Sequence, residues 1–190
     1  ADPMETDISG LDVLQFATAF GRTDNVKFWL DKFPDWDLER KNKVVGGVAL
    51  GQAVYMGPYR HELIRVLLNH GASLNYITDH GSSILTDLCS SEDTDPEILQ
   101  LVLGNIKKKS RVNFKRRGRT LKWRNIYRLA RLLTRNKLIN SGLMAALAQD
   151  SGSTALHYAV QREDVDVVNI LVESGANPTI TNDIGKTSVD

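Results

Sequence analysis

The sequence has little cysteine and no long apolar runs. One long stretch of it also lacks acidic residues. The single cysteine, Cys89, excludes an intramolecular disulfide. Every apolar run is far shorter than the roughly 20 residues that a membrane-spanning helix needs. Residues 98–149 contain no Asp or Glu, although they contain 14 Lys and Arg. We therefore expect a protein of a reducing compartment, in the cytoplasm or alternatively in the nucleus.

The small net charge hides an uneven distribution of charge along the chain. The 190 residues have a formal net charge of +1, with 42% hydrophobic and 25% charged residues, which is typical of a folded domain. Residues 1–97 carry 8 basic and 16 acidic side chains, and residues 150–190 carry 2 basic and 7 acidic ones. A basic block therefore lies between two acidic segments, and we expect it to mark the surface that binds a partner.

A repeat of about 35 residues organises most of the chain. Its clearest copy runs from Asp150 to Asn182. The same glycine recurs, 33 to 37 residues apart, as Gly10, Gly46, Gly81, Gly118, Gly152 and Gly185. A second glycine stands eight residues before the next copy as Gly71, Gly142 and Gly175. This period predicts stacked structural units, each of which buries the apolar face of its neighbour.

The clearest copy also explains why each unit should form a pair of helices. Thr154 is placed to cap the first helix, and the ring of His157 can bond back to it. Leu156 and Ala159 share one face, where the small alanine lets a second helix approach. Gly175 can adopt the left-handed conformation that ends the second helix.

The segments DSGSTALHYAV and VVNILVESGANPTITNDIGKT resemble the ankyrin repeat family. The resemblance implies an all-α solenoid in which each unit is a hairpin loop followed by two antiparallel helices. Residues 1–7 are three residues that precede Met4, which we interpret as added, and a short N-terminal segment. The domain at 8–190 divides into units at 8–43, 44–78, 79–115, 116–149 and 150–182, with a partial sixth at 183–190. The incomplete sixth unit predicts that the chain is the N-terminal part of a larger protein.

The basic block, residues 107–137, falls mainly in the fourth predicted unit and has three interpretations. Its cations can be solvated or paired with the acidic flanking units. They can instead bind carboxylates or phosphates of a partner protein, because Arg binds both in a bidentate manner. They can also bind nucleic acid, an anionic membrane surface or a nuclear import receptor. Trp123 and Tyr127 are placed either to stack on bases or to pack in the core.

The resemblance also indicates where a partner should bind, because hairpin loops and first helices line the concave surface in this family. The candidate partner-binding residues are Tyr76, Ile77, Asp79, His80, Lys115, Arg116, Arg117, Arg119, Lys122, Arg124, Arg128, Ile180, Thr181 and Asn182. We expect a non-catalytic protein-interaction scaffold that binds an acidic or phosphorylated protein. The alternatives are binding of nucleic acid or anionic membrane, and intramolecular regulation of a C-terminal catalytic or channel domain.

Residue patterns for catalysis or for cofactor binding are not found. His61, His70, His80 and His157 are scattered without the spacing of metal ligands. The GKTS sequence at 185–188 lacks the first glycine of a phosphate-binding loop. We therefore predict no enzymatic activity within this chain, no cofactor, no metal and no small-molecule substrate, and we expect Cys89 to be a buried thiol.

Overall fold

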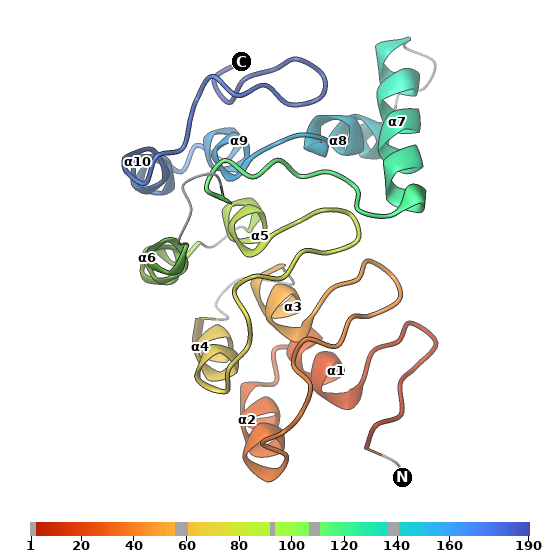
Figure 1. The fold of residues 1–190 in the computed structure, drawn as a ribbon, viewed down its shortest axis with the longest axis vertical. Helices are drawn as coiled ribbons and strands as arrows, with labels where there is room; N and C mark the ends of the chain where they lie inside the picture. Colours follow the sequence, from red (N-terminus) through yellow and green to blue (C-terminus); the bar gives the residue numbers. More distant parts are fainter. Residues whose placement is uncertain (1–2, 56–60, 92–93, 107–110, 137–140) are drawn as a thin grey trace.

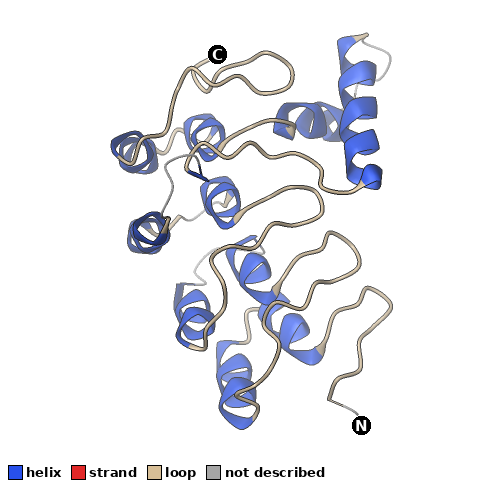
Figure 2. Ribbon diagram, in the orientation of Figure 1, coloured by secondary structure: helices blue, strands red, loops and turns tan. Residues whose placement is uncertain are grey.

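Every regular element in the described part of the chain is an α-helix (Figure 2). The computed structural model describes residues 3–55, 61–91, 94–106, 111–136 and 141–190. Its helices are α1 (Val13–Ala19), α2 (Thr23–Lys32), α3 (Ala49–Tyr55), α4 (His61–Asn69), α5 (Ile84–Ser90), α6 (Pro96–Asn105), α7 (Leu121–Arg135), α8 (Gly142–Asp150), α9 (Ala155–Gln161) and α10 (Val165–Glu173). The predicted all-α class is confirmed.

Eight of these helices form two columns along the long axis of the molecule (Figure 1). In one column α1 packs on α3, α3 on α5 and α5 on α9. In the other column α2 packs on α4, and α6 on α10. Each first helix also packs on the second helix of its own unit. The predicted solenoid of helix pairs is therefore confirmed.

One continuous apolar core runs through the stack. The first-helix leucines that the repeat aligns, Leu14, Leu50, Leu85 and Leu156, are all at most 2% exposed. Burying one such side chain contributes about 2 kcal/mol. Because each layer covers the apolar face of the next, stability is shared along the stack.

Hairpin loops on one side of the stack are closed by a recurring pair of backbone hydrogen bonds. In the third loop Thr78 N donates to Ser82 O (3.0 Å) and Gly81 N donates to Thr78 O (3.0 Å). In the last loop Asn182 N donates to Lys186 O (2.7 Å) and Gly185 N donates to Asn182 O (3.1 Å). Gly81 has φ +94° and Gly185 has φ +86°, which side chains oppose. These bonds give the loops one common geometry.

The predicted fourth unit, residues 116–149, is not a layer of the stack. α5 packs directly on α9, while α7 and α8 pack on each other beside the columns (Figure 1). The cause lies in the loop, where Arg116 N donates to Ser153 O (2.8 Å) and Gly152 N donates to Arg116 O (2.7 Å). This is the bond pair that closes the other hairpins. One hairpin loop is thus split at its tip, and residues 118–150 are inserted there.

Two glycines that the spacing assigned to the repeat have other positions. Gly118 does not adopt the positive φ of the loop glycines, whereas Gly152 does, at +81°. Gly142 begins α8, whereas Gly71 and Gly175 end second helices with φ of +89° and +94°. Because the insertion is about as long as one unit, the regular spacing of glycines in the sequence is kept across it. The insertion nevertheless does not form a layer of the stack. The residue boundaries of the remaining units stay predictions.

Candidate functional site: the arginine-rich inserted helix

The insertion holds α7 beside the hairpin loops through one buried face. The Thr120 side chain caps the helix by accepting a hydrogen bond from Trp123 N (3.4 Å). Tyr127 and Ala130 are buried, at 2% and 0% exposed. The Tyr127 hydroxyl donates to His80 O (3.0 Å) in the third hairpin loop. These contacts fix which face of α7 points to solvent.

The solvent-facing side of α7 is basic. The helix contains Lys122, Arg124, Arg128, Arg131 and Arg135 and no acidic residue. The four arginines are three or four residues apart, so they follow one side of the helix. All are exposed except the half-buried Arg131. Arg131 and Arg135 are absent from the candidate residues, although their spacing from Arg128 is the pattern that could have identified them.

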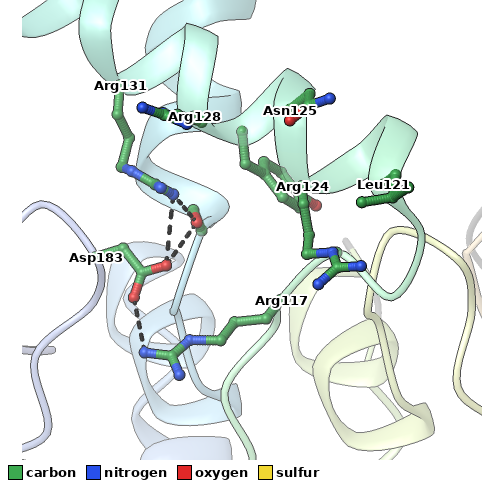
Figure 3. Close-up of a pocket in the computed structure, with 10 residues that line it drawn as sticks. Arg117, Leu121, Arg124, Asn125, Arg128, Arg131 and Asp183 are labelled. Carbon is green, nitrogen blue, oxygen red and sulfur yellow. Dashed lines mark hydrogen bonds and ion pairs between the residues drawn. The ribbon is translucent and has the colours of Figure 1, made fainter.

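Several of these arginines converge on a surface pocket next to the last hairpin loop. Arg117, Arg124, Arg128 and Arg131 line it together with Asp183, as Figure 3 shows, and its volume is about 460 Å³. A neighbouring hollow of about 750 Å³ shares Arg128, Arg131 and Asp183 and adds Arg135. The side of α7 therefore forms an extended, positively charged surface.

One carboxylate partly neutralises this surface. Asp183 Oδ1 lies 3.1 Å from Arg117 Nη2, and Asp183 Oδ2 lies 3.4 Å from Arg131 Nη1 (Figure 3). Partial burial raises the pKa of Asp183, but hydrogen bonds from Ser151 and Arg117 and the nearby charges outweigh this and lower the pKa below its ordinary value. By contrast, Arg124, Arg128 and Arg135 form no ion pair with any residue of the described segments.

Arg116 does not belong to this surface, which corrects its place among the partner-binding candidates. It is 9% exposed, and its Nη1 lies 3.1 Å from Asp150 Oδ2 and donates to the Tyr158 hydroxyl (2.9 Å). Tyr158 in turn donates to Asp150 Oδ1 (2.9 Å). The three side chains join the two ends of the split loop to α9, so Arg116 has a structural role.

Tyr76 and Asn182 are also interior and cannot face a partner as predicted. Tyr76 is 5% exposed, and its hydroxyl donates to Asp87 Oδ2 (2.7 Å). Asn182 is 4% exposed, and its Oδ1 accepts from Ile184 N (3.1 Å) and Lys186 N (3.0 Å). Both side chains form hydrogen bonds inside the domain, so they have structural roles.

The other candidates lie on two separate parts of the surface. Arg117, Arg119, Lys122, Arg124 and Arg128 are exposed on or beside α7. Ile77, Asp79 and His80 are half-buried in the third hairpin loop, and Lys115 Nζ donates to the backbone oxygen of the exposed Thr181 (2.6 Å), next to the half-buried Ile180. Lys107, Lys108, Lys109 and Lys137 of the basic block lie outside the described residues.

Below the third hairpin loop, two titratable groups are perturbed in opposite directions. Burial raises the pKa of Asp87 to about 6, against partial compensation by Tyr76 and Arg116. Burial, together with the charge of Arg116, lowers the pKa of His80 to about 4. The stability that Asp87 contributes is fully present below about pH 4, and it is lost as the pH rises through about 6. The stability that His80 contributes has the opposite dependence: it is fully present above about pH 6.5 and is lost as the pH falls through about 4. The two largely cancel between pH 4 and 6.5.

We expect Asp87→Asn to remove this cancellation. The amide keeps an acceptor for the Tyr76 hydroxyl but no longer carries a buried charge. The variant should gain up to about 3 kcal/mol of unfolding free energy relative to the wild type between pH 4.5 and 7.5. Urea unfolding across this range measures it, with Asp35→Asn at an exposed position as the control for the change in net charge. A constant difference at all pH values contradicts the assignment.

No group of three or more His, Cys, Asp or Glu among the described residues is arranged to hold a metal ion. No helix in the described segments is long and apolar enough to cross a bilayer. Cys89 is 1% exposed, and burial raises the pKa of its thiol above the ordinary range, as expected for a packed side chain.

Comparison with known proteins agrees with this fold. The ankyrin repeat family model matches residues 151–183. The nuclear factor NF-kappa-B p105 subunit of Gallus gallus is 29% identical over 178 residues, which are 89% of this chain and 17% of that protein. The mitochondrial disaggregase of Bos taurus is 40% identical over 72 residues, 38% of this chain and 10% of that protein. The chain thus spans a small part of these relatives.

Solved structures show the same fold over the whole chain. The ankyrin repeat domain of Bcl-3 superimposes with a TM-score of 0.64 at 24% identity, covering 100% of this chain and 66% of that one. A chain from the complex of the Bdellovibrio bacteriovorus predatory endopeptidase Bd0816 with the immunity protein Bd3460 gives a TM-score of 0.67 at 24% identity, covering 100% of this chain and 77% of that one.

Proposed function

The chain is an ankyrin repeat domain, and we propose that it is a non-catalytic interaction scaffold whose α7 binds an acidic or phosphorylated segment of a partner protein. The observation that carries the proposal is the row of arginines on the solvent-facing side of α7, where Arg124, Arg128 and Arg135 have no acidic partner in the described segments. Arg is suited to such ligands because its planar guanidinium binds carboxylates and phosphates through paired hydrogen bonds.

Asp183 supports the proposal because it shows, within this chain, how a carboxylate binds to arginines of this surface. Its two carboxylate oxygens each meet a different arginine, Arg117 and Arg131, at the edge of the same pocket. An acidic side chain of a partner that approached the free arginines of this surface would make the same type of contact. The rigid stack would present the helix already ordered, so little conformational entropy would be lost on binding.

Two of the similar proteins are named as parts of protein assemblies, which agrees with an interaction role. The p105 protein is named as a subunit of nuclear factor NF-kappa-B, and the Bdellovibrio structure is a complex of an endopeptidase with an immunity protein. Nucleic acid is less well supported as a ligand. Tyr127 is 2% exposed and offers no face for stacking on a base, and the half-buried Trp123 does not line the arginine-lined pockets, so among the described residues the arginine surface has no aromatic ring beside it on which a base could stack.

The proposal is tested by substituting serine for Arg124, Arg128 and Arg135 together. The matched control substitutes serine for Arg22, Lys27 and Lys32, three exposed cations around α2, so that the net charge changes equally. The probe is a fluorescein-labelled 12-residue peptide of alternating Glu and Ser, together with its phosphoserine form. We expect the α7 variant to bind roughly 100-fold more weakly by anisotropy, from about 1 kcal/mol for each of three contacts, and the control to bind normally.

Other outcomes of the same assay decide against the proposal. Equal loss in both variants would mean that only net charge matters. Tighter binding of a 20-base-pair duplex than of either peptide, with a steep loss of affinity between 50 and 200 mM salt, would assign the surface to nucleic acid. Preferential binding to phosphatidylserine vesicles would assign it to a membrane surface.

A further inference from the structure

A second surface of the insertion forms a largely apolar groove, which the arginines of α7 do not line. It lies between α3 and α8 and has a volume of about 480 Å³. One wall comes from α3 and the loop before it, and the opposite wall comes from α8 and from Trp123 of α7. The residues that decide its chemistry are Gln52, Tyr55, Arg116, Trp123, Leu143 and Leu147. Because α8 is part of the insertion, the stacked layers alone would not form this groove.

The α8 wall is apolar but largely uncovered. The helix sequence, GLMAALAQD, is that of a buried helix, yet Ala148 is its only fully buried residue. Leu143 is 66% exposed, and Ala146 is exposed beside it on the groove. Tyr55, on the α3 wall, is 60% exposed. Apolar side chains that face each other across an open groove indicate a surface that is covered when a ligand binds.

Three buried polar atoms among the lining residues, Arg116 Nε, Gln52 Oε1 and His80 Nδ1, have no hydrogen-bond partner in the described structure. Arg116 is about nine-tenths buried, and its Nη1 is used by Asp150 and Tyr158, but its Nε–H makes no hydrogen bond. Gln52 Oε1 is buried and also accepts no hydrogen bond. Buried polar groups are normally satisfied, and an orphaned one costs free energy. Arg116 and Gln52 thus leave one donor and one acceptor unused, and the His80 ring nitrogen is a third unused polar atom.

We propose that this groove binds a peptide segment of a partner protein that inserts a large aromatic side chain between α3 and α8. The ring would pack on Leu143, Leu147 and Trp123, which supply the apolar contacts. An adjacent peptide group supplies one C=O and one N–H, the complement of the free Arg116 Nε–H and Gln52 Oε1. A groove of this size accommodates a tryptophan side chain with its flanking peptide groups. The site is independent of the arginine surface on α7.

The test uses N-acetyl-L-tryptophanamide, which carries an indole ring and two amide groups, on the ¹⁵N-labelled full chain. We expect saturable shifts of the Trp123 indole signal and of the backbone amides of Gly51 and Leu143, with a dissociation constant on the order of 0.1–1 mM for so small a fragment. Trp123→Phe assigns the indole signal. 3-Methylindole, which lacks the amide groups, should bind at least about fivefold more weakly if the two polar atoms contribute one hydrogen bond.

A matched pair of variants on α8 locates the binding. Ala146→Trp places an indole in the groove from an exposed position, whereas Ala145→Trp adds the same side chain at the neighbouring exposed position, which does not line the groove. The first should weaken probe binding at least tenfold, and the second should leave it unchanged. Thermal unfolding confirms that both variants fold.

Three results would overturn the proposal. The probe could cause no saturable shift up to 10 mM, or it could bind Ala146→Trp as well as the wild type. The wild-type chain could also be dimeric in solution and become monomeric in Ala146→Trp, which would assign the groove to a second copy of the chain. Because α7 is unchanged in these variants, the acidic-peptide assay reports separately on the proposed function.

Discussion

Deletion of residues 118–150, combined with Arg116→Thr, should leave a cooperatively folded stack that no longer binds the acidic peptide. The two ends of the insertion already meet, because Arg116 N bonds Ser153 O (2.8 Å) and Gly152 N bonds Arg116 O (2.7 Å). Joining Arg117 to Ser151 gives a hairpin of the same length as Thr78–Ser82 and Asn182–Lys186. α5 already packs on α9, so no layer has to move.

The substitution at Arg116 is part of the design, because the deletion also removes Asp150. Arg116 would otherwise stay buried without its carboxylate, whereas threonine is the residue at the corresponding position, Thr78. The deletion without the substitution is therefore the informative control and should be less stable by about 3 kcal/mol or more. Circular dichroism and urea unfolding measure both forms. A broad, non-cooperative transition in the doubly altered chain would show that α7 and α8 are part of the folding unit.

The all-α solenoid could be predicted from sequence because local interactions specify its units. Thr154 and His157, only three residues apart, form the expected capping interaction, with Thr154 Oγ1 2.9 Å from His157 Nδ1. Gly175 ends α10 in the left-handed conformation that the sequence predicts. Leu156 and Ala159 are buried on the shared face of α9. Each of these features depends on neighbours within one turn or one loop, which a single sequence reveals.

The insertion could not be predicted because its defining contact is long-range. Gly152 and Arg116 are joined by a hydrogen bond, although 35 residues separate them in the sequence. The inserted segment has nearly the length of a unit and carries Gly118 near the expected position, so spacing alone continues through it. One local sign that the segment is not a regular repeat is that Lys122 and Asn125 stand at the places that Leu156 and Ala159 occupy in the clearest copy.

The sequence predicted which residues of the candidate site are charged, but it did not predict which of them are buried. Arg124 and Arg128 lie on the exposed side of α7, because a helix sorts residues by their spacing. Arg116 stands in the same basic run, yet it is inside. Its burial depends on Asp150 and Tyr158, which the split loop brings next to it. The residues around Arg116 in the sequence do not predict these partners.

Asp150→Ala should cost about 3–5 kcal/mol of unfolding free energy, because it leaves Arg116 as an uncompensated buried charge. Asp150 Oδ2 lies 3.1 Å from Arg116 Nη1, and Asp150 Oδ1 accepts from the Tyr158 hydroxyl (2.9 Å), so the substitution removes the carboxylate of Arg116 and the acceptor of Tyr158. For a chain of this length the loss corresponds to a fall of roughly 10 °C or more in Tm. Differential scanning calorimetry and urea unfolding measure the change.

Two further variants separate the cost of the unpaired charge from the value of the pair. Arg116→Thr in the Asp150→Ala background removes the charge, so it should recover most of the lost stability, since a buried pair can often be replaced at little net cost. Glu97→Ala breaks the Arg65–Glu97 pair, which is shorter, at 2.7 Å, but whose side chains are 49% and 82% exposed. It should cost no more than about 1 kcal/mol, because solvent screens exposed charges. Equal losses for Asp150→Ala and Glu97→Ala would mean that Arg116 is solvated in solution, and the split loop would then be held by its backbone hydrogen bonds alone.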